Sequence, residues 1–177
     1  MKILISGGCK NGKTALALKI AEKLGKNRKR YYVAAMIPYD DEDRARIKRH
    51  IAEREGRGFI TLEIGRDIAS CLQDENGVYL IDSVTALLTN EMFLPDGTVD
   101  TASEKRCTDG LLTVACKAHD AIFVTDDIFS DAERYDEITE AYRISLAALN
   151  RALAKECDTV IELCAGNMII HKGGFDL

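Results

Sequence analysis

Short apolar runs alternate along the chain with longer segments in which apolar residues recur at helical spacing. The short runs predict strands over residues 2–6, 31–36, 59–64, 77–82, 121–125, 159–164 and 168–171. The longer segments predict helices over residues 13–24, 40–55, 67–72, 84–93, 101–119 and 133–155. In the first helix, Leu16, Ile20 and Leu24 share one face, and Gly25 marks its end.

This alternation predicts an α/β fold with a mostly parallel sheet and helices on both of its faces. The last two runs are joined by the turn Ala165-Gly166-Asn167, so we expect them to form an antiparallel hairpin at the sheet edge. No repeat, linker or low-complexity tract divides the chain, and 177 residues suit one domain over residues 1–177.

Composition narrows the functional classes. The net charge is −5, which argues against a nucleic-acid partner. No apolar run approaches the ~18 residues of a membrane span, and residues 1–6 are too short for a signal peptide, so a cytoplasmic protein is expected. The cysteines are scattered without a CxxC pair, and we expect them to be reduced.

A glycine-rich segment between the first strand and the first helix fits the phosphate-loop pattern G-x4-G-K-[ST]. Its residues are Gly7, Gly8, Cys9, Lys10, Asn11, Gly12, Lys13 and Thr14. Backbone amides of such a loop and the positive end of the following helix bind phosphate. We expect Lys13 to neutralise the β- and γ-phosphates and Thr14 to ligate Mg²⁺.

Carboxylates follow two of the predicted strands. Asp82 ends the run 77–82 and is expected to hold Mg²⁺ together with Thr14. Asp126 and Asp127 follow the run 121–125 and have three interpretations: metal ligands, a general base, or caps of the next helix. Capping or loop solvation is slightly favoured.

The helix 40–55 carries Glu42, Arg46, His50 and Arg54 at intervals of four, so they share one face. Neighbouring positive charge favours a neutral, nucleophilic imidazole. From spacing alone, an exposed ion-paired helix with an incidental histidine is favoured over a catalytic one. His119 is expected at a helix end, where the helix dipole accounts for it, and His171 on a surface strand.

Several segments together resemble one enzyme family. They are residues 3–14, Tyr32-Val33-Ala34-Ala35 followed by Asp41-Glu42 and Arg46-Ile47-x-x-His50, Thr61-Leu62-Glu63, residues 80–85, Leu88-Thr89-Asn90, and residues 142–150 with Asp158-Thr159-Val160. Nearly end to end, the chain is similar to the bifunctional adenosylcobinamide kinase / adenosylcobinamide-phosphate guanylyltransferases of cobalamin biosynthesis. The segment Arg46-Ile47-x-x-His50 is the most specific of these matches.

The resemblance implies a RecA-like P-loop fold, a homotrimer and two reactions. In the first, ATP or GTP phosphorylates adenosylcobinamide. In the second, a histidine at the position of His50 takes GMP from GTP and passes it to adenosylcobinamide phosphate. Besides the phosphate loop, the positions that match the family's GTP contacts are Ala34, Ala35, Met36, Ile51, Ala52, Glu53, Arg54, Glu63 and Asp82.

The chain departs from the family pattern at Ala35, Met36, Asp126, Asp127, Ile144 and Ala147. These positions face nucleotide or corrinoid in the family, so they bear on guanine preference and on which activities are retained. Two other functions stay open: a diverged P-loop small-molecule kinase with a silent His50, and a non-catalytic nucleotide-binding switch.

Overall fold

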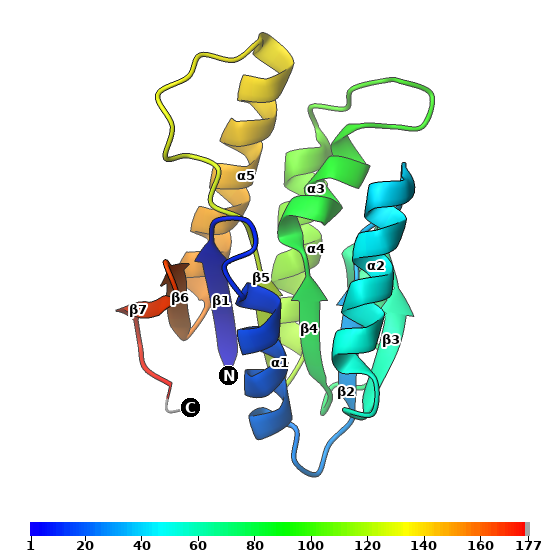
Figure 1. The fold of residues 1–177 in the computed structure, drawn as a ribbon, viewed down its shortest axis with the longest axis vertical. Coiled ribbons are helices and arrows are strands. Elements are labelled where there is room, and N and C mark those ends of the chain that lie inside the picture. Colours follow the sequence, from blue (N-terminus) through cyan, green and yellow to red (C-terminus); the bar gives the residue numbers. More distant parts are fainter. Residues whose placement is uncertain (176–177) are drawn as a thin grey trace.

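A computed structural model describes residues 1–175, and its centre is a seven-stranded sheet in the order β3-β2-β4-β5-β1-β6-β7 (Figure 1). The strands are β1 (Lys2–Gly7), β2 (Arg30–Ala34), β3 (Phe59–Glu63), β4 (Val78–Asp82), β5 (Asp120–Val124), β6 (Thr159–Cys164) and β7 (Asn167–Lys172). All neighbouring strands are parallel except β6 and β7. The predicted α/β class and the predicted edge hairpin are therefore confirmed.

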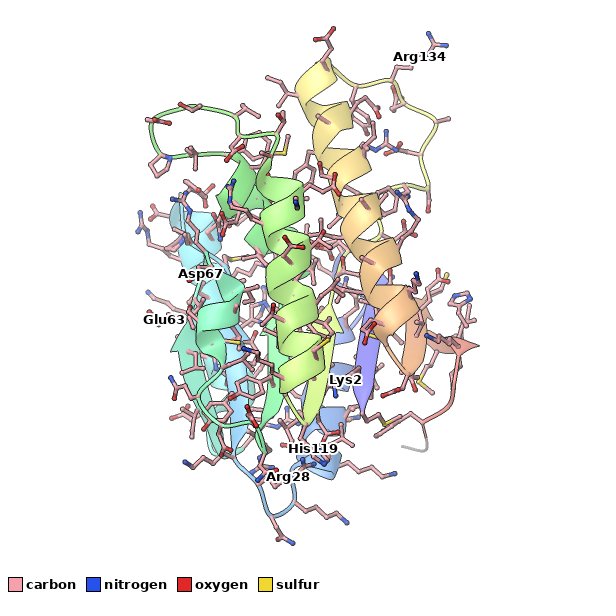
Figure 2. The ribbon with its side chains drawn as sticks, turned by 180° about the vertical axis from the view of Figure 1, so that it is seen from behind. Lys2, Arg28, Glu63, Asp67, His119 and Arg134 are labelled. Atoms are coloured by element: carbon pink, nitrogen blue, oxygen red, sulfur yellow. The ribbon has the colours of Figure 1, made fainter. Side chains whose placement is uncertain are left out.

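Helices cover both faces of the sheet (Figure 1). They are α1 (Lys13–Leu24), α2 (Asp41–Arg54), the 3₁₀ helix η1 (Ile68–Cys71), α3 (Val84–Met92), α4 (Ser103–Lys117) and α5 (Glu137–Glu156). Helices α1 and α2 lie on one face, and the others lie on the opposite face, which Figure 2 shows from behind. No helix within residues 1–175 combines the length and apolarity needed to cross a bilayer.

Alternation along the strands divides the core into two clusters. Val78 and Leu80 of β4 pack on the side of α1, whereas Tyr79 and Ile81 pack against α3, α4 and α5. All four are fully buried. A strand with helices on both faces must be apolar at every position, which explains the continuous apolar run in the sequence.

Among the predicted boundaries that differ from the structure, one is wrong by two residues and another by four, each for a local reason. The strand predicted over 31–36 ends at Ala34 because its neighbours β3 and β4 end opposite it, at Glu63 and Asp82. The helix predicted from residue 133 begins at Glu137, because the Asp136 carboxylate accepts hydrogen bonds from the amides of Ile138 and Thr139.

His119 is not explained by a helix end, because α4 ends at Lys117. Its Nδ1 lies 2.7 Å from a nitrogen of Arg28 and 3.1 Å from Oδ2 of Asp120. His119 and Arg28 lie together at the end of the molecule opposite the phosphate loop (Figure 2). This cluster is therefore separate from the candidate site. The candidate site lies at the other end of the strands, where β1, β4 and β5 lead to Gly7, Asp82 and Asp126.

Candidate active site

The loop between β1 and α1 depends on two glycines. A Cβ on Gly7 would lie 2.5 Å from the carbonyl oxygen of Leu163, which no side chain tolerates. Gly12 caps α1 with a φ of 87°, a conformation that glycine adopts without strain. Asn11 donates a 3.2 Å hydrogen bond to the Leu163 carbonyl and ties the loop to β6. The predicted strand–loop–helix context of the phosphate loop is confirmed.

Lys13 is only 7% exposed and its ammonium group makes three short contacts. It donates to the carbonyls of Gly7 and Gly8, at 2.9 and 2.7 Å, and lies 2.8 Å from Oδ1 of Asp126. The slightly favoured interpretation of Asp126, a cap or a solvated loop residue, is therefore wrong. The Asp126 carboxylate lies in the site, because β5 ends beside the phosphate loop.

Asp127 behaves as a local loop residue. Its carboxylate accepts hydrogen bonds from the Phe129 amide at 3.1 Å and from the Ser130 hydroxyl at 3.0 Å. It does not cap a helix, since α5 begins only at Glu137. The two neighbouring carboxylates thus have different surroundings: Asp126 faces Lys13, and Asp127 stabilises its own loop.

Asp82 collects two hydroxyl donors. The Thr14 hydroxyl donates to Oδ2 at 2.9 Å, and the Tyr32 hydroxyl donates to the same oxygen at 2.6 Å. Burial and the charge of Asp82 raise the pKa of Tyr32, so this phenol remains a proton donor at neutral pH. Tyr32 was not among the predicted site residues, because Tyr31, Tyr32 and Val33 are all buried and the sequence does not show which tyrosine faces Asp82.

Thr14 and Asp82 form a donor set that fits Mg²⁺. This ion prefers oxygen ligands and is usually bound through one or two carboxylates together with substrate phosphates. Within residues 1–175 no cluster of three or more His, Cys, Asp or Glu side chains could hold a metal by itself. The residues present therefore suit an ion that arrives with a nucleotide.

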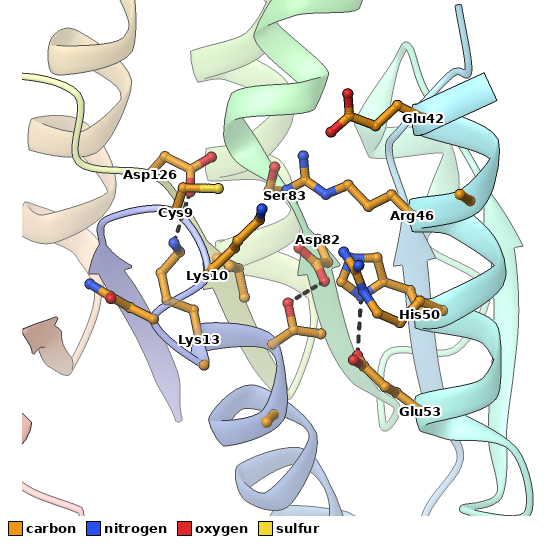
Figure 3. A pocket seen from close by; sticks show the side chains of 17 residues that line it. Cys9, Lys10, Lys13, Glu42, Arg46, His50, Glu53, Asp82, Ser83 and Asp126 are labelled. Carbon is orange, nitrogen blue, oxygen red and sulfur yellow. Dashed lines mark hydrogen bonds and ion pairs between the residues drawn. The ribbon is translucent and has the colours of Figure 1, made fainter. Parts of the chain in front are cut away.

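His50 lies on the opposite wall, on the inward side of α2 (Figure 3). Its side chain is 20% exposed, and Nδ1 lies 3.2 Å from Oε2 of Glu53, one helical turn further on. This is an ion-pair distance, although the geometry is not that of a hydrogen bond. Among the described residues, Nδ1 therefore has only this ion-pair contact, and Nε2 has neither a hydrogen bond nor an ion pair.

These groups line one cavity of about 500 Å³. Lys13, Thr14 and Asp126 form one side of it, and His50 and Glu53 form the other, with Asp82 between them. Cys9, Lys10, Asn11 and Gly12 also line it. The cavity thus brings together the phosphate loop, where the sequence pattern predicted a triphosphate site, and His50, which only the family resemblance implied to be a nucleophile.

A second cavity of about 480 Å³ adjoins the first and shares His50 and Asp82 with it. Of the positions matched to GTP contacts, it is lined by Ala34, Met36, Arg54 and Glu63. Arg54 is nearly buried and stacks on the Tyr32 ring, with Cζ 4.2 Å from the centroid.

Three of the matched positions line neither cavity. Ala35 is completely buried, with its amide hydrogen-bonded to the Asp82 carbonyl. Ile51 and Ala52 lie on the exposed side of α2. The helical period places Ala52 on the side of α2 away from His50, whereas Ile51 lies one turn beyond Ile47, which lines the second cavity, and is itself exposed.

Comparison with known proteins gives one family match and several structural matches. The family model "Cobinamide kinase / cobinamide phosphate guanyltransferase" matches residues 3–170. A search of curated protein sequences gave no significant match.

Among solved structures, an ATPase domain matches with 14% identity and a TM-score of 0.58, over 97% of this chain and 76% of that one. A protein of Pyrococcus horikoshii OT3 matches with 13% identity and a TM-score of 0.55, over 99% and 87%. An ATPase of a bacterial type III secretion system matches with 15% identity and a TM-score of 0.52, over 93% and 51%. These likenesses concern the fold alone and agree with the predicted RecA-like P-loop architecture.

Proposed function

This chain belongs to the cobinamide kinase / cobinamide phosphate guanyltransferase family of cobalamin biosynthesis, whose members are transferases, and from that premise we propose how its site works. It phosphorylates adenosylcobinamide with ATP or GTP, and it then transfers GMP from GTP to adenosylcobinamide phosphate through a covalent GMP–His50 intermediate.

One observation carries this proposal: the phosphate loop and His50 line the same cavity. A nucleotide whose terminal phosphates lie at Lys13 extends toward α2, because the second cavity continues the first in that direction. Its α-phosphate then approaches the nitrogen of His50 that Glu53 does not contact. A histidine without a role in the reaction is not expected to line the same cavity as the phosphate loop.

Phosphoryl transfer requires positioning and charge neutralisation. Lys13 exchanges its contacts with the Gly7 and Gly8 carbonyls and Asp126 for the β- and γ-phosphates. Thr14 and Asp82 would hold Mg²⁺, which when bound would further neutralise phosphate charge. The hydroxyl oxygen of the cobinamide arm forms a bond to Pγ, the bond from Pγ to the β,γ-bridging oxygen breaks, and the hydroxyl proton passes to solvent or a carboxylate.

Guanylyl transfer requires a nucleophile. Nε2 of His50 forms a bond to Pα of GTP, and the bond from Pα to the α,β-bridging oxygen breaks with release of pyrophosphate. Glu53, beside Nδ1, stabilises the positive charge of the modified ring. A phosphate oxygen of the acceptor then attacks Pα, the Pα–Nε2 bond breaks, and His50 returns to its neutral form.

We propose that the nucleotide also occupies the second cavity. We place the GTP base there, near Ala34, Met36 and Glu63, because it is the more apolar neighbour of the triphosphate site. The Glu63 carboxylate is the natural acceptor for the N1–H and amino group of guanine, a donor pair that adenine lacks.

The decisive experiment is covalent labelling with GTP that carries ³²P at the α-position. Wild type should form a labelled species that is labile in acid and stable in base, as expected of a phosphoramidate. His50→Ala should form none, whereas the control His171→Ala, which changes an exposed histidine paired with Glu162, should label normally. Equal labelling of His50→Ala would refute the intermediate. Phosphorylated cobinamide without any label would instead indicate a kinase alone.

We further propose that residues 1–177 act as one domain in a cytoplasmic homotrimer, on the strength of the family resemblance. Light scattering coupled to size exclusion should give three times the 19.6 kDa mass of the chain. A monomeric, fully active enzyme would reject the trimer and leave the chemistry untouched.

A further inference from the structure

Three cavities meet beside α2, and Arg46 borders all of them. Besides the two described above, a third cavity of about 190 Å³ lies between the start of α2 and α3 and reaches Asp126. Arg46 and Ser83 are the residues that all three have in common. Arg46 extends from α2 into the site, one helical turn before His50 (Figure 3). Its charge therefore lies where the three cavities meet.

Arg46 has no hydrogen bond or ion pair within residues 1–175. Arg49 of the same helix also lines the first cavity without such a partner, but Arg49 is exposed and borders neither of the other two cavities, whereas Arg46 is half-buried. Arg44, on the outer side of the same helix, pairs with Asp41 at 3.2 Å. Arg54 stacks on Tyr32 and donates to Thr61. The half-buried guanidinium of Arg46 is not among the buried side-chain groups that lack a partner, so its donors face the open cavities. An anionic ligand in the cavities would supply one.

The walls of the first cavity show what such a ligand would meet. Lys13 is on one side and His50 on the other, and Arg46 borders the space between the phosphate loop and α2. A triphosphate that reaches from Lys13 to His50 passes Arg46. A planar guanidinium suits this position, because its fork of donors binds two phosphate oxygens at once.

We propose that Arg46 is a catalytic residue that neutralises phosphate charge in the transition states of both reactions. This inference rests on the proposed function. In guanylyl transfer it donates N–H bonds to the oxygens of the departing pyrophosphate as the bond from Pα breaks. In phosphoryl transfer it donates to the γ-phosphoryl oxygens while the acceptor oxygen attacks. Arg46 gives up no proton in either step, since a guanidinium stays charged at all relevant pH values.

Single-turnover kinetics at saturating Mg–GTP test this role, with Arg46→Ala and Arg46→Lys as variants and Arg44→Ala as the matched control. We expect Arg46→Ala to lower both the rate of GMP–enzyme formation and the rate of cobinamide phosphorylation by about 10³-fold, the low end of an arginine's effect on phosphoryl transfer. The Kd of Mg–GTP should change by less than about tenfold, because the interaction strengthens in the transition state. Arg44→Ala should match wild type.

Chemical rescue separates catalysis from a structural role. Added guanidinium should restore part of the activity of Arg46→Ala and none of that of His50→Ala. Arg46→Lys keeps the charge and the aliphatic stem, so it should fold as wild type and retain an intermediate rate. Normal rates for Arg46→Ala, or a loss confined to Kd, would overturn the proposal. Absence of labelled enzyme in wild type would instead reject the guanylyl chemistry, while the phosphorylation assay would still decide the role of Arg46.

Discussion

The Tyr32 hydroxyl donates a 2.6 Å hydrogen bond to Oδ2 of Asp82, the oxygen that also accepts from Thr14. Two donors on one oxygen fix the rotation of the carboxylate, and under the proposed function the other oxygen, Oδ1, is the one available to Mg²⁺. The guanidinium of Arg54 stacks on the ring of Tyr32. Because Arg54 and His50 belong to the same helix, the tyrosine links the proposed nucleophile helix to the proposed metal ligand.

Removing only the Tyr32 hydroxyl should weaken Mg²⁺ binding. Tyr32→Phe keeps the ring and its contact with Arg54, so the fold should be unaffected. Loss of a hydrogen bond to a metal-binding carboxylate typically costs 10–100-fold in metal affinity, and we expect roughly tenfold here. The apparent Mg²⁺ affinity in the nucleotide assay should fall, while kcat at saturating Mg²⁺ stays within a few-fold of wild type.

Tyr31→Phe is the matched control for this experiment. Tyr31 is the preceding residue of β2 and packs on the opposite face of the sheet, with its ring 4.7 Å from that of Tyr79. Its substitution should leave the Mg²⁺ dependence as in wild type. An unchanged Mg²⁺ dependence in Tyr32→Phe as well would mean that Thr14 alone positions Asp82.

The ion pair between Lys13 and Asp126 competes with nucleotide for the lysine. Both its 2.8 Å length and the 7% exposure of Lys13 indicate that a phosphate must displace this carboxylate or share the ammonium with it. Asp126→Asn removes the competing charge with little change in shape. Isothermal titration should therefore show tighter binding of Mg–triphosphate, by several-fold to about tenfold, the scale of a partly exposed charge pair. The control Asp127→Asn should bind as wild type, and weaker binding by Asp126→Asn would show that the carboxylate supports the site.

Much of the fold followed from the apolar pattern, because strands buried on both faces are continuous apolar runs and the helices carry an apolar face. Helix α1 was predicted residue for residue. The strand order was not predictable, because neighbours such as β1 and β5 are more than 100 residues apart in sequence. The start of α5 was also missed: Glu133 and Asp136 both suit a helix start, and only the hydrogen bonds of Asp136 decide between them.

The candidate site was predictable in its parts and not in its contacts. The spacing of its glycines predicted the phosphate loop, and the position of Asp82 at the end of an apolar run predicted its place in the site. Asp126 was visible at a strand end, but its partner depends on how Lys13 folds back over its own loop. Tyr32 gave no signal, since one of two adjacent tyrosines in an apolar run faces Asp82 and the sequence does not say which.

The buried carboxylate of Asp120 should make stability depend on pH. Burial alone would raise the pKa of Asp120, but hydrogen bonds from the terminal ammonium of Met1, from Arg28 and from His119 outweigh it and lower the pKa. A depressed folded pKa means stabilisation that is present above the unfolded pKa of about 3.9 and is lost as pH falls through the folded value.

Asp120→Asn tests this assignment by urea unfolding at several pH values. Asp120 is buried but its partners are partly exposed, so removing its charge should lower the free energy of unfolding by about 2 kcal/mol at pH 7, the scale of hydrogen bonds to a charged group. The difference from wild type should shrink once the pH falls below the ordinary pKa of an aspartate. Nucleotide binding by Asp120→Asn should be as in wild type, because Asp120 begins β5 and Lys13 lies at the other end of the strands. A difference that is constant down to pH 2 would point to packing and not charge.

Glu63 should decide between guanine and adenine nucleotides. It ends β3 and lines the second cavity together with Ala34 and Met36, which offer no polar side chain to a base. Glu63→Gln keeps the size but replaces one acceptor oxygen with a donor, which would face the N1–H or amino group of guanine. Since an unmatched hydrogen-bonding group is rejected strongly, kcat/KM for GTP should fall by roughly 10²-fold or more, whereas that for ATP should change little.

Inosine triphosphate, which lacks the 2-amino group, provides an internal control. Wild type should use it less well than GTP, and Glu63→Gln should narrow that gap because the acceptor for the amino group is gone. The fold should be intact, since Glu63 is exposed and its pairing with β2 runs through the backbone. If wild type and Glu63→Gln discriminated GTP from ATP equally, the base would lie outside the second cavity. The nucleotide would then extend from Lys13 in another direction.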